Sequence, residues 1–162
     1  MVETHRYDSA RDLFEAARDA SRENYRTRRM LVAMEEQEGL RGAGTGARVA
    51  SGSIGDPMAR VDARVDREAA WHRRIEENCE LIDLAHFVLY GTDCENGLAA
   101  LVPGWWCDAI WQHYINGLTW KQTAKLVGFS AHRCWEVAQT AFDMADGYGI
   151  VSAVRGRGLA ED

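Results

Sequence analysis

Residues 114–142 read YINGLTWKQTAKLVGFSAHRCWEVAQTAF and carry the local signals that decide the fold of the C-terminal third. Thr119 and Gln122 form the Thr-x-x-Gln pattern of a capping box, so a short helix is predicted to start at Thr119. Gly128 has no Cβ and can adopt the positive φ that ends such a helix in a turn. Ser130 is a typical N-cap for the helix that follows. The pattern predicts two helices joined by a tight, glycine-containing turn, which is a helix-turn-helix.

The second helix of this pair is predicted to run from Ala131 to about Asp146. Five small or apolar residues at helical spacing are expected to form its buried face: Cys134, Val137, Ala138, Ala141 and Phe142. Leu126 and Phe129 are expected to be buried beside them, with Phe129 packing on Cys134 as a hydrophobic staple. Ala124 is small enough for the two helices to approach each other closely. These residues are predicted to fix the angle at which the helices cross.

Three further helices are predicted upstream. Pro103 opens one that ends at Asn116-Gly117 in a left-handed glycine cap. A long one lies within Tyr7–Glu38, which contains no Gly or Pro. Another begins at Asp56-Pro57, an N-cap followed by Pro at the first helical position, and stops at Gly91. The first long helix has a narrow seam of Leu13, Ala17, Ala20, Asn24, Thr27, Leu31 and Met34. The second has Val61, Val65, Ile75, Cys79, Ile82 and Leu89, widened by Leu81, Leu84 and Val88.

The fold class is therefore predicted to be all-α, with two long N-terminal helices followed by a C-terminal helix-turn-helix. The long helices are expected to pair as a hairpin or a coiled-coil-like arm. Residues 39–56 hold six of the 15 glycines and are predicted to be a flexible linker. The predicted parts are an N-terminal helix (1–38), this linker (39–56), a long acidic-ended helix and loop (57–97), the helix-turn-helix domain (98–147) and a flexible tail (148–162).

The net charge of −6, from 19 basic and 25 acidic residues, argues at first against binding to nucleic acid. The charge is unevenly distributed, however. Residues 76–104 contain six acidic residues and no Lys or Arg, so the rest of the chain is close to neutral. Residues 119–139 contain three basic residues, Lys121, Lys125 and Arg133, and one acidic residue, Glu136, so this stretch has a net positive charge. A local DNA-binding surface is therefore compatible with the composition.

Several other classes of protein are disfavoured by the sequence. No apolar run is long enough to span a membrane, and the N-terminus lacks the layout of a signal peptide, so a cytoplasmic location is expected. The four cysteines, Cys79, Cys94, Cys107 and Cys134, lack zinc-site spacing and are expected to be free thiols, with no metal or cofactor. No Gly-rich phosphate loop, nucleophile elbow or zinc-hydrolase pair is present, so no enzymatic activity is expected.

Residues 101–142 resemble region 4 of sigma-70-type factors. The matching positions are Gly117-Leu118-Thr119, Ala124, Leu126, Gly128 and Ser130. The chain departs from the family pattern at Gln122-Thr123, where Glu followed by Ile or Val is common, and it has no counterpart of the promoter-melting region 2. The longer layout is similar to small phage and prophage regulators of the late-gene-activator or autolysin-regulator type. The resemblance implies a regulator that reads DNA rather than a complete sigma factor.

The resemblance also implies which residues contact DNA. The helix that starts at Ala131 would enter the major groove, with Arg133 reaching guanine, Gln139 adenine and Glu136 a cytosine amine. Thr119, Lys121 and Lys125 would contact phosphates. The complete implied set is Thr119, Lys121, Lys125, Ser130, His132, Arg133, Trp135, Glu136 and Gln139.

Double-stranded DNA is thus the expected partner, bound weakly by one copy because so few cations face it. A homodimer formed through the long helices would double the contacts, and the acidic stretch 76–104 would suit a basic surface of RNA polymerase. Two alternatives remain open. One is a DNA-packaging component resembling small terminase subunits. The other is a helical protein-interaction module that does not bind DNA.

Overall fold

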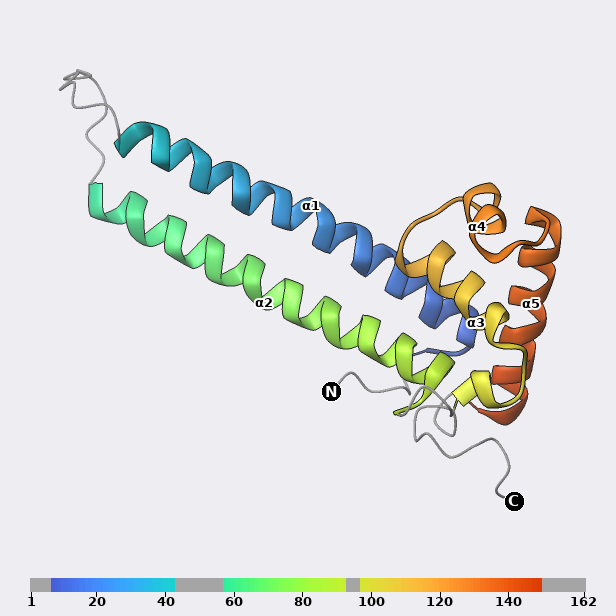
Figure 1. Ribbon diagram of the computed structural model, residues 1–162. Helices are drawn as coiled ribbons and strands as arrows, with labels where there is room; N and C mark the ends of the chain where they lie inside the picture. The colour runs from blue at the N-terminus through green and yellow to red at the C-terminus, as the bar shows by residue number, and fades with distance from the viewer. Residues whose placement is uncertain (1–6, 43–56, 93–96, 150–162) are drawn as a thin grey trace. The chain divides into compact units, whose positions relative to one another are not determined.

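The computed structural model describes residues 7–42, 57–92 and 97–149, and every regular element in these ranges is helical. The elements are α1 (Ala10–Gly42), α2 (Pro57–Tyr90), the 3₁₀ turn η2 (Gly97–Ala100), α3 (Gly104–Ile110), the π-helical turn η3 (Trp111–Ile115), α4 (Trp120–Val127) and α5 (Ala131–Tyr148) (Figure 1). The all-α prediction with two long N-terminal helices is confirmed. None of the described helices combines the length and the apolar composition that crossing a bilayer requires.

The chain divides into two compact units. Unit 1 comprises Met1–Arg22 and Glu77–Asp162, and unit 2 comprises Glu23–Glu76. The first turns of α1 and the last turns of α2 therefore belong to the same unit as α3, α4 and α5. The prediction placed residues 1–38 and 98–147 in separate parts of the chain. A boundary inside a continuous helix leaves no mark in the sequence, because helix periodicity continues through it.

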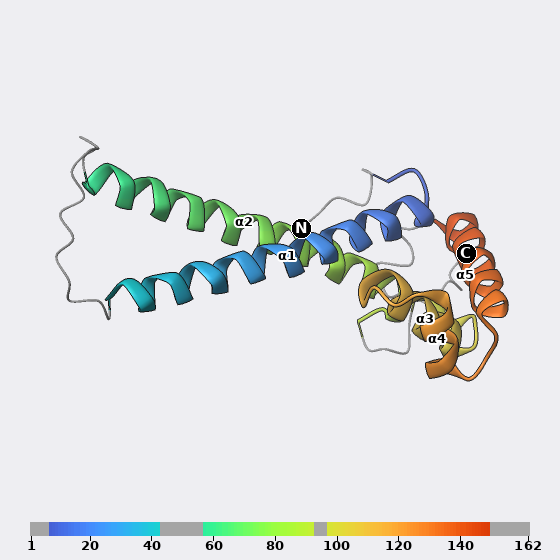
Figure 2. The same cartoon turned by 90° about the horizontal axis from the view of Figure 1, so that it is seen from above.

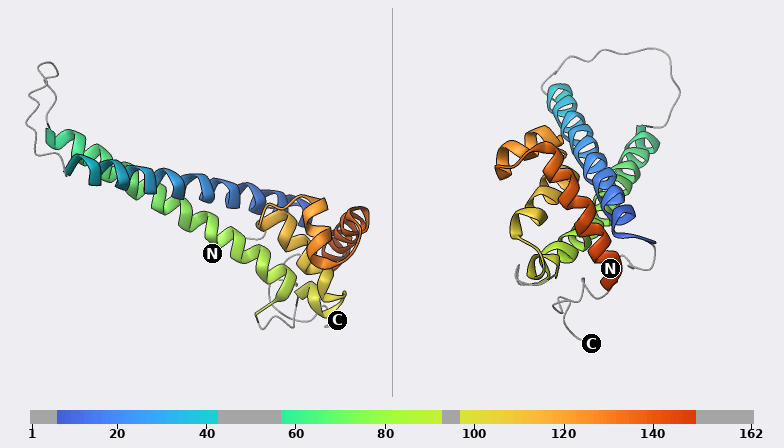
Figure 3. Two further views of the ribbon diagram at one scale, coloured as in Figure 1. Left: turned by 45° about the horizontal axis from the view of Figure 1, so that its top comes forward. Right: turned by 90° about the vertical axis from the view of Figure 1, so that its right-hand side faces the viewer.

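In unit 2, α1 and α2 run antiparallel, side by side (Figures 2 and 3). Two ion pairs across the seam agree with this direction, one between Arg74 and Glu23 at 3.2 Å and one between Arg64 and Glu38. Asn24 is buried in the seam and its side-chain amide lies 3.5 Å from the carbonyl oxygen of Ile75. The hairpin form of the predicted pairing is thus the one observed in this unit.

The seam predicted for α1 is confirmed along its length. Leu13, Ala17, Ala20, Asn24 and Thr27 are buried, and Leu31 and Met34 are half-buried. The helix also runs through Gly42, four residues into the predicted linker. A glycine within a helix lowers helix stability by only about 1 kcal/mol relative to alanine, and neighbouring helix-forming residues can offset this. The remainder of the predicted linker, 43–56, which includes the predicted N-cap Asp56, lies outside the described residues. The same is true of the tail from residue 150 onward.

The seam predicted for the first half of α2 was wrong. Val61 and Val65 are 48% and 52% exposed, whereas Arg64 and Glu68 are half-buried. Each residue advances about 100° round a helix, so Arg64 and Glu68 lie within about 20° of Ile75, and Val65 lies roughly 80° away from it. The strongly apolar C-terminal end of α2 is buried and sets the rotation of the helix about its axis. At that rotation the side chains of Val61 and Val65 lie outside the seam.

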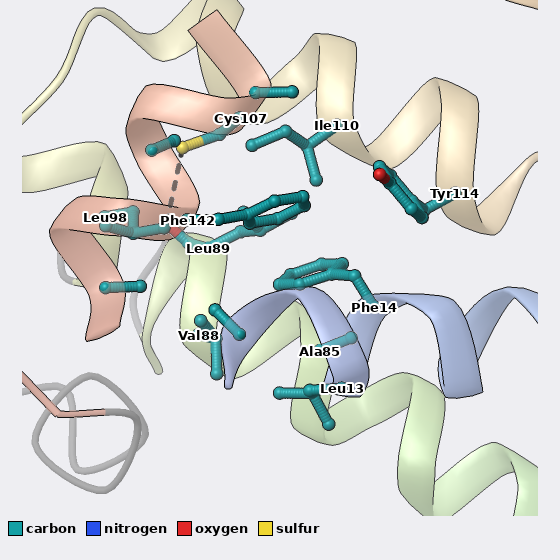
Figure 4. Packing of buried hydrophobic residues seen from close by; sticks show 14 of the residues in the cluster. Leu13, Phe14, Ala85, Val88, Leu89, Leu98, Cys107, Ile110, Tyr114 and Phe142 are labelled. Atoms are coloured by element: carbon teal, nitrogen blue, oxygen red, sulfur yellow. Dashed lines mark hydrogen bonds between the residues drawn. The ribbon is translucent and has the colours of Figure 1, made fainter. Parts of the chain in front are cut away.

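The core of unit 1 is built around three aromatic rings from three elements (Figure 4). Phe14 of α1 stacks on Phe142 of α5 at a centroid distance of 5.2 Å. Tyr114 meets both rings edge-on, at 6.0 Å and 5.5 Å. Leu13, Val88, Leu89, Leu98 and Ile110 are fully or almost fully buried around them. Because Phe14 has no exposed surface, α1 supplies a part of this core that α2 to α5 alone would lack.

Between α2 and α3, the backbone of Gly97 lies in close contact with the C-terminal end of α2. This glycine has a φ of 67°, and a Cβ on it would lie 2.8 Å from the Val88 carbonyl oxygen and 2.9 Å from the Gly91 nitrogen. The predicted stop of α2 at Gly91 is confirmed, since the helix ends at Tyr90. Gly97 was not singled out from the sequence, because the close approach depends on a fold that brings η2 onto the end of α2.

The helix predicted from Pro103 to Asn116 is present, but its second half widens into the π-helical turn η3. The Asn116 amide donates to the Trp111 carbonyl at 3.1 Å, and Gly117 has the predicted positive φ, at 72°. The freed carbonyl of Ile115 accepts a hydrogen bond from the Ser21 hydroxyl of α1 at 2.7 Å. This bond ties α1 to the segment that leads into α4.

Candidate nucleic-acid interface

The local signals that predicted the two C-terminal helices are all present in the structure. The Thr119 hydroxyl accepts from the Gln122 amide at 3.2 Å, and the Gln122 side chain accepts from the Thr119 amide at 2.9 Å, which completes the capping box. Gly128 ends α4 in the left-handed conformation, with a φ of 80°. The Ser130 hydroxyl accepts from the Arg133 amide at 3.1 Å and caps α5. A short α4, a tight turn and a longer α5 therefore follow one another as predicted.

The inner side of α4 differs from the prediction. Leu126 and Phe129 were expected to be buried, yet they are 64% and 45% exposed, whereas Thr123 has no exposed surface. Phe129 stacks on Trp105 of α3 at 3.9 Å, and Cys134 is buried without it. The predicted staple between Phe129 and Cys134 is thus replaced by a contact to α3. Sequence spacing alone could not show this, because Trp105 is 24 positions away.

The orientation of α4 is fixed by a stack between His113 of η3 and Trp120, the first residue of α4. The two rings lie 3.7 Å apart at an angle of 13°. The His113 Nδ1 lies 2.7 Å from the Leu118 carbonyl oxygen, which can only accept, so Nδ1 carries the proton and donates. With Trp120 held in this way, Thr123, one turn further along α4, points into the core. The sequence alone did not identify this role of His113.

The pKa of His113 is lowered from its ordinary value, chiefly by burial. The positive charges of Arg18 and Arg22 lower it further, against an opposing contribution from the hydrogen bond to Leu118. The imidazole is therefore neutral at pH 7. A neutral ring can stack on Trp120 and donate to Leu118 without bringing a charge into the core.

The first two turns of α5 present a polar row on the side opposite their buried face. His132, Arg133 and Trp135 are exposed and Glu136 is half-exposed, while Cys134, Val137 and Ala138 are buried. Four of the positions predicted to face outward on this helix, His132, Arg133, Trp135 and Glu136, do so in the structure. Trp135 is 46% exposed, and its ring is stacked with that of His132 at 6.0 Å. An exposed tryptophan on a polar helix face offers a large apolar contact for a partner.

Glu136 interacts with two other residues of this row. One of its carboxylate oxygens lies 3.2 Å from His132 Nε2 and the other lies 3.5 Å from an Arg133 guanidinium nitrogen. Pairs this exposed contribute about 0–1 kcal/mol and exchange readily with solvent or with a ligand. Arg133 keeps most of its five donors available for a base edge or a phosphate. The row can therefore bind an anion once the weak pairing with Glu136 is exchanged.

The other predicted contact residues fall into two groups. Lys121 and Lys125 are exposed on α4 and can reach an external anion. The hydroxyls of Thr119 and Ser130 are already engaged in the helix caps. Gln139 is half-buried, and its side-chain oxygen accepts from the guanidinium of Arg11 in α1. Arg11 is a member of this surface that sequence reasoning missed, because nothing in the local sequence links positions 11 and 139.

Cys107 and Cys134 serve as packing groups. Burial raises the pKa of the Cys107 thiol to about 12, and the neighbouring Asp108 carboxylate adds to that rise. Burial also raises the pKa of the Cys134 thiol, so both are neutral near pH 7. Cys94 lies outside the described residues. In the parts of the chain that the structure describes, no three His, Cys, Asp or Glu side chains gather closely enough to hold a metal ion.

No family model matches the chain, and no curated protein or solved structure matches it either. Function is therefore inferred from the residues of the chain and from the geometry of unit 1.

Proposed function

We propose that the chain is a sequence-specific DNA-binding transcription regulator, of the kind encoded by phages or prophages, without enzymatic activity. One observation carries the proposal. A short capped helix and a tight turn precede α5, whose first two turns are buried on one side and present His132, Arg133, Trp135 and Glu136 on the other. This is the arrangement by which a helix-turn-helix presents a reading helix to the major groove.

The reading residues have distinct roles in this proposal. The Arg133 guanidinium exchanges Glu136 for the O6 and N7 acceptors of a guanine. The Glu136 carboxylate, released from that pairing, is free to accept from a cytosine amine, and Trp135 packs on a thymine methyl group. Gln139 reaches adenine only after it parts from Arg11. The exposed Lys121 and Lys125 of α4 bind phosphates and fix the register on the duplex.

A single copy should bind DNA weakly, because Glu136 engages both His132 and Arg133. We propose that two copies associate through the helical hairpin of unit 2, which doubles the contacts. The valines that leave the seam, Val61 and Val65, are one helical turn apart and exposed. The double variant Val61→Glu/Val65→Glu should be monomeric by light scattering where the wild type is dimeric. An unchanged mass would disprove this interface.

RNA polymerase is the second partner that we propose. Four acidic residues near the end of α2 are exposed: Glu76, Glu77, Glu80 and Asp83. A negative helix face of this kind suits a basic surface on a large partner. Purified polymerase should be retained by the immobilised wild type and lost with Glu77→Lys/Asp83→Lys. Equal retention by both proteins would exclude this surface.

The test of DNA reading is a selection of bound duplexes from a random-sequence library by the full chain, followed by affinity measurements on the selected site. The variant Arg133→Ala/Gln139→Ala should lose preference for the selected site while its circular dichroism stays unchanged. The matched control is Gln37→Ala/Arg67→Ala, which removes the same side chains from exposed positions of unit 2. The control should select and bind as the wild type does.

Three outcomes would overturn the proposal in different ways. Preserved specificity in Arg133→Ala/Gln139→Ala would disprove the assignment of the reading helix. Ring-shaped oligomers that bind DNA without a preferred site would favour a packaging component. A complete absence of DNA binding from low to high salt would leave a helical protein-interaction module.

A further inference from the structure

The first three turns of α1 belong to unit 1 and carry three arginines on one side of the helix. Arg11, Arg18 and Arg22 are separated by seven and four positions, which brings them to nearly the same angle round an α-helix. Glu15 lies between them on the same stripe, so the stripe has three positive charges and one negative charge. Within the described ranges, none of the three arginines forms an ion pair with a carboxylate.

One end of this stripe lies beside α5. The Arg11 guanidinium donates to the side-chain oxygen of Gln139, which belongs to the proposed reading face. Tyr114 is the core ring that packs on Phe142 of α5. Burial raises its pKa, the charge of Glu15 raises it further, and the charges of Arg11 and Arg18 lower it. These contacts place the beginning of α1 along the flank of the helix that is proposed to enter the groove.

The other end of the stripe lies beside η3, the turn that leads into α4. Ser21 of α1 donates to the Ile115 carbonyl at 2.7 Å. The positive charges of Arg18 and Arg22, on the same helix, contribute to the lowered pKa of His113. His113 stacks on Trp120, which is followed directly by Lys121. This end of the stripe thus lies beside the segment that leads into α4, where the lysine expected to bind phosphate is found.

The environment of Arg18 supports an external ligand for this stripe. Its Nε is buried with no hydrogen-bond partner among the described residues, while the side chain as a whole is half-exposed. Arg22 is exposed. Because its Nε is buried, the inner part of the Arg18 side chain is packed within unit 1, and its guanidinium would lose less side-chain entropy on binding an anion than that of a fully exposed arginine.

We propose that Arg11, Arg18 and Arg22 form a phosphate-binding strip on α1, which contacts the DNA backbone beside the groove read by α5. This inference rests on the proposed function and extends its interface to a helix more than a hundred residues away from the reading helix in the sequence. Among the described residues of unit 1, the strip doubles the number of arginine and lysine side chains, from Lys121, Lys125 and Arg133 to six. It carries affinity and no base preference, because phosphates are the same at every step of the duplex.

The test compares two double variants of the full chain in a potassium chloride series, with binding measured by fluorescence anisotropy. Arg18→Gln/Arg22→Gln should reduce the slope of log affinity against log salt by about 2, at about 1 per lost phosphate contact. Affinity should fall by a similar factor for the selected site and for random duplex, with the order of preference unchanged. Arg67→Gln/Arg73→Gln removes the same charge from exposed positions of unit 2 and should keep the wild-type slope.

Because Arg18 is partly buried, Arg22→Gln alone serves as the second variant. It should lower the slope by about 1 without changing the unfolding transition. A wild-type slope in both Arg22→Gln and the double variant would disprove the phosphate strip and leave the proposed function intact. The same loss in Arg67→Gln/Arg73→Gln would also disprove it, since net charge alone would then be responsible. If the wild type binds no duplex at all, the proposed function fails, and the strip fails with it.

Discussion

The two long helices are held together in different ways at their two ends. In unit 1, α1 and α2 enclose a core of aromatic and aliphatic side chains that includes Phe14, Val88 and Leu89. In unit 2, the same helices meet across the buried Asn24 and Thr27, the half-buried Leu31 and Met34, and the ion pairs of Arg64 and Arg74, and none of its described apolar residues is fully buried. Apolar burial contributes about 25 cal/mol per Å², whereas an exposed ion pair contributes about 0–1 kcal/mol. Unit 1 should therefore be the stable part and unit 2 the part that opens first.

This difference matches the functions proposed for the units. A reading helix needs a rigid support, and α5 has one in the stacked rings of Phe14, Tyr114 and Phe142. A hairpin with a polar seam has little to lose when it opens, so association with a second copy can stabilise it by mass action. The comparison can be tested by changes that act on one unit at a time.

The largest effect is expected from Phe14→Ala, which should lower the free energy of unfolding by about 3–5 kcal/mol. The ring is fully buried between α5 and η3, and its removal leaves a cavity in the core of unit 1. Urea unfolding, followed by tryptophan fluorescence, measures the change. Tyr25→Ala is the control, since Tyr25 is an aromatic residue of α1 that is 66% exposed, and it should shift the transition by less than about 0.5 kcal/mol.

Hydrogen exchange adds a test of which unit responds to Phe14→Ala. Exchange should accelerate most in α3, α4 and α5, because these helices share the damaged core. Equal acceleration throughout the Glu23–Glu76 hairpin would mean that the two units unfold as one, and the contrast between them would be wrong.

The next effect is expected from Gly97→Ala, with a loss of about 1–3 kcal/mol. The substitution forces a Cβ to within 2.8–3.0 Å of backbone atoms of Phe87, Val88 and Gly91, at a φ of 67°. Gly104→Ala is the matched control, because a Cβ there meets nothing within 4 Å, and it should be neutral. Thermal unfolding measures both variants. A neutral Gly97→Ala would show that η2 can move off the end of α2 at little cost.

The fold class, the helix caps and the outward face of α5 could be predicted because each depends on residues within about one helical turn. Thr119, Gly128 and Ser130 act within three or four positions, and all three are confirmed. The prediction errors occur at side chains whose positions depend on contacts with residues far away in the sequence. Phe129 packs on Trp105 instead of Cys134, and Leu126, which was expected in the core, is exposed. Arg11 could not be linked to Gln139, because their proximity depends on α1 entering the core through Phe14.

A smaller effect should appear as a pH dependence in unit 1 from His113. Its folded-state pKa lies below the ordinary value of 6.5, so the unfolded chain binds the proton more tightly. The stability from His113 is then fully present above about pH 6.5 and is lost as the pH falls through the folded pKa, by at most about 1.4 kcal/mol per pH unit. His113→Phe keeps an aromatic ring against Trp120 and removes the titration. The stability difference between wild type and variant should shrink from pH 7.5 to pH 5, and a constant difference would rule out His113 as the source.

The smallest effect is expected in unit 2 from Arg64→Gln, which removes the pairs with Glu38 and Glu68. The loss should be at most about 1 kcal/mol, because the pairing side chains are only half-buried and water screens them. Added salt should erase most of it, since the Debye length falls from about 10 Å at 0.1 M to about 3 Å at 1 M. Phe14→Ala, whose effect comes from apolar burial, should keep its full loss at the same salt concentration. Hydrogen exchange of the Glu23–Glu76 segment at both salt concentrations measures the change. A loss above 2 kcal/mol that persists in 1 M salt would show that the polar seam stabilises the hairpin as strongly as an apolar core, and the distinction between the two units would not hold.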